Sequence, residues 1–260
     1  MTTPRHSPPR SLLFLPASNP RAIAKARTLA ADAILLDLED AVAEADKAAA
    51  RAAARAALDE GFGPRLAMIR INGVDHEAHR DDLAMVTTSA DYVVLPKVER
   101  TADAAAVAQV THRPVLAMIE TPVGVLNAAA IAAVPGVAGL IAGTNDLRAT
   151  IGIPMTASRD AISHALQAIV LAARAAGGWA FDGVYNMLDD ADGFAAEAGA
   201  GRDLGFDGKT LIHPSQVDPC NRAFGPSAAD IEEAKALVAA HSGGAERFRG
   251  RMIEGMHVDQ

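Results

Sequence analysis

Short apolar segments alternate with longer amphipathic segments along most of this chain of 260 residues. The apolar segments hold few polar residues, which is typical of strands covered on both faces, as in a parallel sheet. Their alternation with helical segments predicts repeated β–α units. The predicted strands are Ser11–Leu15, Ala33–Asp37, Leu66–Ile71, Tyr92–Leu95, Val115–Ile119, Val137–Ile141, Trp179–Asp182 and Gly208–Ile212.

The segments between the strands have the spacing of amphipathic helices. About eight β–α units in roughly 250 residues match the size of a (β/α)8 TIM barrel. A doubly wound open sheet would show the same alternation, so this pattern leaves both folds open. Ser227 is placed to cap the last helix. The clearest helices are Pro20–Ala30, Glu44–Leu58, Arg159–Ala176, Asp189–Leu204 and Ala228–Ala240.

Almost every predicted strand is followed by charged or hydrogen-bonding residues. In a closed barrel the carboxyl ends of all strands converge on one mouth, whereas an open sheet would spread them along an edge. The convergence favours the barrel, and we expect a barrel domain over residues 10–240 followed by a tail over residues 241–260. The polar segments are Pro16–Asn19, Asp37–Asp40, Arg70–Gly73, Pro96–Glu99, Glu120–Pro122, Gly143–Asp146, Asp182–Gly183 and His213–Ser215.

Composition narrows the class of protein. The formal charge of −8 and a pI near 5.4 argue against nucleic acid or an anionic membrane as the main partner. No apolar run reaches the roughly 18 residues of a membrane span, and the first ten residues do not resemble a signal peptide. Cys220 is the single cysteine, which excludes an intrachain disulfide and a cysteine-based metal site. We expect a cytoplasmic protein.

Two carboxylates follow neighbouring strands. Glu120 comes directly after Val115–Ile119, and Asp146 follows Val137–Ile141 across a glycine-containing turn. Two oxygen ligands with room for water and substrate oxygens suit Mg²⁺. In a second interpretation, which the residues alone leave open, Glu120 caps a helix beginning at Thr121-Pro122 and Asp146 is a turn residue.

Arg70 ends an otherwise apolar strand, where its guanidinium could bind a substrate carboxylate in a bidentate manner. The alternative is a buried ion pair with Asp37 or Glu39. The acids Asp37, Glu39 and Asp40 are crowded, and crowded carboxylates repel one another unless a cation or a proton intervenes. They either orient metal-bound water or pair with Arg70 and Lys97, and we favour orientation of water over direct metal ligation.

Four further residues carry reactive groups. Lys97 and Lys209 lie at predicted strand ends and could in principle form a Schiff base with a carbonyl substrate. A lysine beside acids stays protonated, so we favour ion-paired structural roles for both. His213 could be a general base, but a structural role at the barrel rim is favoured. Cys220 is interpreted as a packing residue.

Taken together, these motifs resemble the HpcH/HpaI aldolase/citrate lyase superfamily, in particular its citrate lyase β-subunit-like proteins. The similarity covers about residues 10–239, with the motifs in family order and at family-like spacing. Each motif is weak alone, but seven in register are specific. They are Arg10–Pro16 with Asn19–Arg21, Leu36–Val42, Arg70–Asn72, Leu95–Glu99, Ile119–Thr121, Gly143–Leu147 and Lys209–Pro214.

The resemblance implies a TIM barrel that assembles as a homotrimer or as a dimer of trimers. It implies that Glu120 and Asp146 hold Mg²⁺, and that Arg70 and Glu120 contact a small 2-oxo or hydroxy acid. It also implies that the first loop and helix, through Arg21 and Lys25, bind the phosphates of a CoA thioester.

The activity implied is a Mg²⁺-dependent carbon–carbon lyase acting on a thioester of the citryl-CoA, citramalyl-CoA or malyl-CoA type. Arg70, Glu39 and Asp40 are the candidate catalytic residues, and Glu39, Asp40 or a water molecule handles the proton. One departure from the family is Ala17, where relatives have glycine and where a methyl group would crowd the thioester arm. The alternatives are a CoA-independent class II 2-oxo-acid aldolase and a non-catalytic subunit that binds an acid or CoA.

Overall fold

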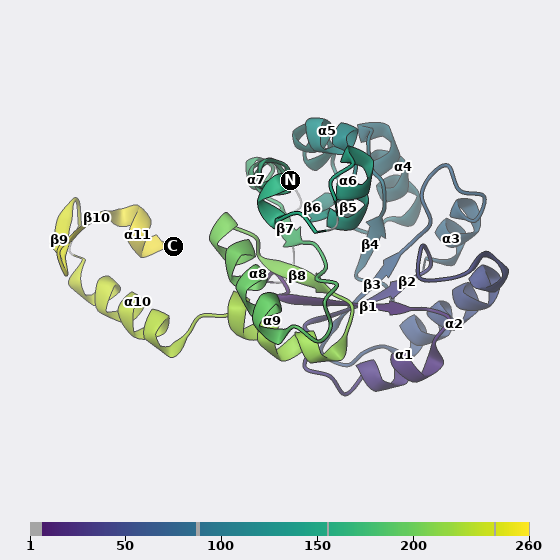
Figure 1. The fold of residues 1–260 in the computed structure, drawn as a ribbon, viewed down its shortest axis with the longest axis horizontal. Helices are drawn as coiled ribbons and strands as arrows, with labels where there is room; N and C mark the ends of the chain where they lie inside the picture. Colours follow the sequence, from purple (N-terminus) through teal and green to yellow (C-terminus); the bar gives the residue numbers. More distant parts are fainter. Residues whose placement is uncertain (1–6, 87–88, 155, 242, 260) are drawn as a thin grey trace. The chain divides into compact units, whose positions relative to one another are not determined.

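The structure, a computed structural model, describes residues 7–86, 89–154, 156–241 and 243–259. Eight parallel strands close into a barrel in sequence order, so that β1 pairs with both β2 and β8 (Figure 1). This confirms the TIM barrel and excludes the open sheet. Each strand begins at its predicted residue and ends within one residue of the prediction. The strands are β1 (Ser11–Pro16), β2 (Ala33–Asp37), β3 (Leu66–Arg70), β4 (Tyr92–Leu95), β5 (Val115–Ile119), β6 (Val137–Ala142), β7 (Trp179–Asp182) and β8 (Gly208–Leu211).

Helices follow the strands and form the outer layer of the barrel (Figure 1). The helix predicted from Pro20 ends earlier than expected, at Ala26, because the backbone N–H of Thr28 turns back to the carbonyl of Lys25. Two other predicted helices begin with a 3-10 turn, at Glu44–Asp46 and Arg159–Ile162. The helices of this unit are α1 (Pro20–Ala26), α2 (Lys47–Glu60), α3 (His79–Met85), α4 (Thr101–Thr111), α5 (Pro122–Ala132), α6 (Thr144–Ile151), α7 (Ser163–Ala175), α8 (Ala191–Leu204) and α9 (Val217–Phe224).

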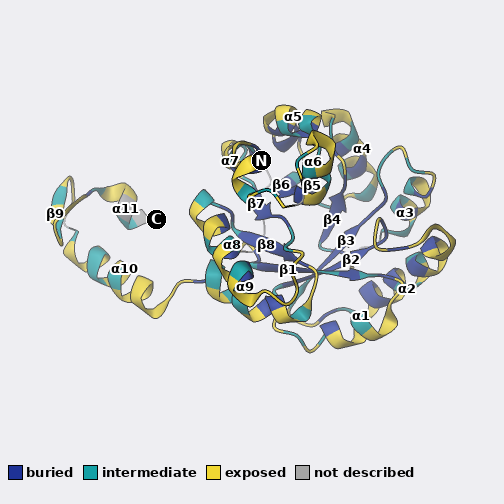
Figure 2. Ribbon diagram, viewed as in Figure 1, coloured by how far each residue is buried: buried dark blue, intermediate teal, exposed yellow. Residues whose placement is uncertain are grey.

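The barrel strands are buried on both faces, as their continuous apolar character predicts (Figure 2). One set of strand residues fills the interior of the barrel, including Leu35, Met68 and Leu116. The alternate set packs in a second layer against the helices, including Leu36 and Ile69. A closed apolar interior beneath the strand ends leaves the carboxyl-terminal mouth as the place where polar side chains can gather.

The residues after Phe224 form a separate compact unit. Its helix α10 (Ala228–Ala240) has the predicted bounds, and Ser227 caps it with Asp230 in a reciprocal pair of hydrogen bonds. The strands β9 (Glu246–Phe248) and β10 (Arg251–Ile253) form an antiparallel pair, followed by α11 (Gly255–Asp259).

The division into compact units lies after Phe224, and the expected barrel domain over residues 10–240 extends past it. None of the side chains of α10 is buried. Among the described residues, no helix has the length and apolar character needed to cross a membrane.

Candidate active site at the barrel mouth

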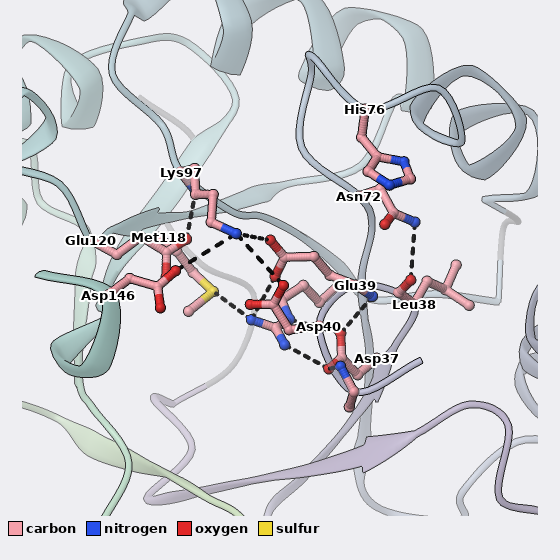
Figure 3. A network of polar contacts seen from close by, with 12 residues as sticks. Asp37, Leu38, Glu39, Asp40, Asn72, His76, Lys97, Met118, Glu120 and Asp146 are labelled. Carbon is pink, nitrogen blue, oxygen red and sulfur yellow. Dashed lines mark hydrogen bonds and ion pairs between the residues drawn. The ribbon is translucent and has the colours of Figure 1, made fainter. Parts of the chain in front are cut away.

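A cavity of about 410 Å³ opens at the carboxyl ends of the strands. Carboxylates, one guanidinium and apolar side chains share its wall, and Figure 3 shows the polar groups converging from different strands. The lining includes Phe14, Asp37, Asp40, Arg70, Met118, Glu120 and Asp146. The convergence predicted from the strand ends is therefore observed.

Glu120 and Asp146 lie on the same side of this cavity (Figure 3). Glu120 follows β5 and is 3% exposed, whereas the Asp146 side chain lies in the first turn of α6 and is 39% exposed. The cap of α5 is Thr121, whose side chain accepts from the N–H of Gly124. Because Thr121 fills that role, the interpretation of Glu120 as a helix cap is wrong.

Gly143 makes room for the Glu120 carboxylate. A β-carbon added at Gly143 would lie 2.4 Å from Oε2 of Glu120 and 2.3 Å from its β-carbon. Both separations are far below van der Waals contact, so only glycine allows the β6–α6 turn to approach Glu120 this closely. The glycine in the predicted turn is thus part of what sets the carboxylate position.

Lys97 connects several of these acids. Its backbone N–H donates to Oε1 of Glu120 at 2.6 Å, and its Nζ donates to Oε1 of Glu39 at 2.8 Å. The same ammonium lies 3.6 Å from a carboxylate oxygen of Asp40 and 3.6 Å from one of Asp146. Lys97 has a φ of 53°, a left-handed conformation that is unusual for a residue other than glycine. The predicted ion-paired role is observed.

Arg70 is engaged by Asp37. Its Nε donates to Oδ1 of Asp37 at 2.7 Å and its Nη2 donates to Oδ2 at 2.6 Å. Its Nη1 lies 2.8 Å from Oε2 of Glu39, although the two groups are not aligned as a hydrogen bond. The guanidinium also stacks over the ring of Phe14, with 4.8 Å between guanidinium carbon and ring centre. The ion pair considered as the alternative is therefore present, and Arg70 still lines the cavity.

The acids at the mouth outnumber the bases. We call the set Asp37, Glu39, Asp40, Arg70, Lys97, Glu120 and Asp146 the mouth cluster. With five carboxylates against two cations, its formal charge is −3 (2 − 5) when all are ionised. Burial and the charge of Glu39 raise the pKa of Glu120 to about 7. Burial also raises the pKa of Glu39, against the charge of Arg70 and the hydrogen bond from Lys97.

This surplus of negative charge fits a divalent cation. Glu120 and Asp146 offer hard oxygen donors beside a cavity that leaves room for water and substrate oxygens, the environment that Mg²⁺ prefers. Within the described residues, no group of three or more His, Cys, Asp or Glu side chains is arranged to hold a metal. A site built from two carboxylates plus external ligands is therefore the metal site that these residues fit.

The other candidate residues lie outside the cavity lining. Arg21 and Lys25 are exposed on α1. The side chain of His213 caps the 3-10 turn Pro214–Gln216, as its favoured structural role requires. Cys220 is buried, its Sγ lies within hydrogen-bonding distance of the carbonyl of Arg10, and burial raises the pKa of its thiol to about 12. Ala17 is fully buried among the apolar side chains outside the barrel.

Lys209 belongs to a second charged group. Its fully buried ammonium lies 2.8 Å from both Asp182 and Glu197. Arg159 completes the group, 2.6 Å from Asp182 and 2.9 Å from Glu197. We call these four residues the sealed cluster. The structural role predicted for Lys209 is observed, because no substrate carbonyl can reach a fully buried amine.

Sequence reasoning missed the apolar part of the site. Phe14 and Met118 line the cavity, Phe14 under the guanidinium of Arg70 and Met118 with its sulfur 3.9 Å from Nη1 of Arg70. The period of two in a strand could have found Phe14, because Leu12 on the same strand face lies inside the barrel. No local signal indicates that either residue contacts Arg70, since that contact depends on how distant strands pair.

Comparisons with known proteins agree with this geometry. The family model described as HpcH/HpaI aldolase/citrate lyase matches residues 10–214. The chain is 46% identical to a (3S)-malyl-CoA thioesterase of Cereibacter sphaeroides, over 96% of this chain and 91% of that protein. It is 40% identical to a citrate lyase subunit beta-like protein of Deinococcus radiodurans, over 96% and 92%. The solved structure of CitE from Mycobacterium tuberculosis with magnesium, acetoacetate and coenzyme A matches with a TM-score of 0.85 and 37% identity, over 96% of this chain and 94% of that one.

Proposed function

This chain belongs to the HpcH/HpaI aldolase/citrate lyase family, and on that premise we propose that it cleaves a carbon–carbon bond in the CoA thioester of a small hydroxy acid. The observation that carries the proposal is the convergence of Glu120, Asp146 and Arg70 on one cavity. The two carboxylates hold Mg²⁺, which when bound polarises a carbonyl or hydroxyl oxygen of the acid. Neighbouring structures with magnesium and oxaloacetate or pyruvate support this choice of metal and ligand.

Arg70 binds the carboxylate of the acid. A guanidinium has five N–H donors, and Asp37 takes one from Nε and one from Nη2. Donors on Nη1 and Nη2 remain, and Arg70 borders the cavity. Burial opposes the charge of Arg70, but the hydrogen bond and charge of Asp37 raise its pKa above the usual value, so the group stays cationic. Stacking on Phe14 and pairing with Asp37 hold it in place for the incoming carboxylate.

Asp40 is the residue we assign to proton transfer. It lines the cavity and its side chain is 60% exposed, whereas Glu39 is held by Arg70 and Lys97. Asp40 takes the proton of the substrate hydroxyl as the carbon–carbon bond breaks and the hydroxyl carbon becomes a carbonyl. The thioester part leaves as an enolate, and protonated Asp40 returns its proton to the enolate carbon, which regenerates the carboxylate. Glu39 acts by orienting Arg70 and Lys97.

A second reaction of the same substrate is hydrolysis of its thioester. The similarity of 45–46% to (3S)-malyl-CoA thioesterases over 96% of the chain favours it. The acid would be held in the same way by Arg70 and the metal, and the bond broken would be carbon–sulfur. For either reaction we propose that Arg21 and Lys25 on α1 bind the phosphates of CoA, because both are exposed and share one helix face.

One assay separates these reactions. Purified protein is incubated with malyl-CoA, citramalyl-CoA or citryl-CoA, with Mg²⁺ or with EDTA, and the products are resolved by chromatography. Carbon–carbon cleavage of malyl-CoA yields acetyl-CoA and glyoxylate, whereas hydrolysis yields malate and free CoA. Turnover of a 2-oxo acid with an aldehyde in the absence of CoA would favour the class II aldolase instead. Saturable binding with no turnover of any of them would favour the non-catalytic subunit.

We also propose that the protein is a cytoplasmic homotrimer or hexamer, on the strength of the family resemblance. Light scattering on the eluting protein measures its mass against the 26.9 kDa of one chain. A monomeric mass at micromolar concentration would contradict the assembly. Fractionation of the source cells would test the compartment.

A further inference from the structure

Lys97 contacts the mouth cluster through two of its own groups, the backbone N–H and the side-chain ammonium. Its backbone N–H donates to Glu120, and its ammonium contacts Glu39, Asp40 and Asp146. Figure 3 shows the ammonium between the Glu39–Asp40 side of the cluster and the Glu120–Asp146 side. Arg70, the other cation of the cluster, pairs with Asp37 and Glu39 and so contacts carboxylates on one side.

The backbone of Lys97 is adapted to this place. A φ of 53° costs energy for a residue with a β-carbon, and such conformations persist where the surroundings over-determine them. The left-handed turn directs the N–H to Oε1 of Glu120, one of the two proposed metal ligands. Glycine would adopt the same φ without strain but would lack the ammonium. The presence of lysine at this position therefore needs an explanation in terms of its side chain.

The ammonium is a counter-charge for carboxylates that would otherwise repel one another. It donates a hydrogen bond to Glu39 at 2.8 Å, and it lies 3.6 Å from Asp146. Its side chain is 44% exposed, so it can change its position without disrupting the core. A cation bound to Asp146 would lie close to this ammonium, and the two positive charges would repel each other.

We propose that Lys97 is a positioning residue whose ammonium draws Glu39, Asp40 and Asp146 together and competes with Mg²⁺ for Asp146. The inference rests on the metal site of the proposed function. Lys97 thereby holds both proposed ligands, Glu120 through its backbone N–H and Asp146 through its ammonium, and the ammonium charge weakens Mg²⁺ binding. It is not a nucleophile, because the Glu39 hydrogen bond and the charges of Glu39, Asp40 and Glu120 raise the pKa of the amine above its usual value, against the opposing effect of burial.

The test is calorimetric titration of the metal-free full chain with Mg²⁺. Lys97→Met keeps the length of the side chain and removes its charge, and it should bind Mg²⁺ about tenfold tighter, since an ammonium beside a divalent cation is repelled even through solvent. Lys97→Arg keeps the charge and should bind like the wild type. Lys97→Gly removes the ammonium without backbone strain and should also bind more tightly. The matched control is Lys235→Met, an exposed lysine paired with Glu232 in the C-terminal unit, which should change nothing.

Thermal unfolding gives a second readout that a merely structural lysine would not produce. In EDTA, Lys97→Met should unfold at a lower temperature than the wild type, because the carboxylates lose their counter-charge. Saturating Mg²⁺ should remove that difference, so the metal-induced rise in melting temperature is larger in the variant. A structural role would lower the melting temperature equally with and without metal.

Unchanged or weaker Mg²⁺ binding in both Lys97→Met and Lys97→Gly would overturn the inference. Failure of the proposed metal site has a different signature, because the wild type itself would then show no saturable Mg²⁺ binding. Neither readout depends on turnover, so the choice between carbon–carbon cleavage and hydrolysis does not affect the result.

Discussion

The barrel contains two groups of charged side chains that differ in balance and in access. The sealed cluster pairs Arg159 and Lys209 with Asp182 and Glu197, so its formal charge is zero (2 − 2). Its members project from the outer face of β7 and β8 and from α8 and a 3-10 turn, and Lys209 and Asp182 are fully buried. The mouth cluster has five acids against two bases and borders the cavity.

The difference in charge balance indicates a structural role for the sealed cluster and a functional role for the mouth cluster. A buried charge is tolerated when it is paired, and in the sealed cluster each charged group is paired within the cluster. The mouth cluster does not, because its negative charges exceed its positive ones and burial already raises the pKa of Glu120 to about 7. Unbalanced charge facing a cavity is what a cation and an anionic substrate can complete together.

The largest effect is expected from breaking the sealed cluster. Lys209→Met leaves Asp182 and Glu197 partly unpaired in the core, which should cost about 3–5 kcal/mol of unfolding free energy. Urea unfolding followed by circular dichroism measures it. The exposed pair of Lys235 and Glu232 provides the control, and Lys235→Met should have little effect. Equal stability of the two variants would show that burial of the cluster does not matter.

Removal of one mouth carboxylate should abolish activity and leave the fold intact. Glu120→Gln or Asp146→Asn should lower Mg²⁺-dependent turnover by more than about a hundredfold, because even the partners of metal ligands commonly matter that much. The free energy of unfolding should change little, since each variant removes one negative charge from a cluster that has more acids than bases. Turnover is measured at limiting Mg²⁺. Retention of most activity in either variant would remove that residue from the metal site.

Replacing Arg70 by a cation of different shape should weaken binding of the small acid substrate. Arg70→Lys keeps the cation but loses the planar fork and the paired contact with Asp37, so affinity for oxaloacetate or pyruvate should fall about tenfold. Calorimetry with Mg²⁺ present measures it. If the affinity is unchanged, Arg70 is structural and its pairing with Asp37 is its whole role.

Acidification should reveal the contribution of Asp182. Burial opposes its charge, yet the charges of Lys209 and Arg159 lower the pKa of Asp182 below its usual value. A carboxylate with a lowered pKa stabilises the fold above its unfolded pKa, about 3.9, and the stabilisation is lost as the pH falls through the folded value. The difference in unfolding free energy between wild type and Asp182→Asn should therefore shrink below about pH 4. A difference that stays constant from pH 7 to pH 3 would contradict this.

The smallest effect concerns residues outside both clusters. Charge reversal at Arg21 and Lys25 should weaken binding of a CoA thioester a few-fold at low salt and hardly at all at high salt, because exposed charges are screened. Mg²⁺ binding should not change. Fluorescence competition at two ionic strengths measures thioester binding at low salt and at high salt. Loss of thioester binding that is independent of salt would point to a change of fold in α1 instead.

Much of the site could be predicted because it depends on local pattern. Glu120 and Asp146 each follow a continuous apolar strand, and barrel closure brings such positions to one mouth whatever the details of packing. The cavity with both residues in its wall confirms this prediction of position. By contrast, the hydrophobic period that predicts α10 does not tell which compact unit the helix belongs to, because that depends on long-range contacts.

The sequence by itself determined the bounds of the strands, their order and the polar character of the mouth. Each of these follows from the local pattern of apolar and polar residues. Only the tertiary structure decided which charges pair. Arg70 meets Asp37 across 33 residues of chain, and Lys97 meets Glu39 across 58. Those partners depend on the register of neighbouring strands and on loop conformations such as the left-handed turn at Lys97. Local pattern assigns a residue to a face, but the pairing of distant charges is settled when the barrel closes.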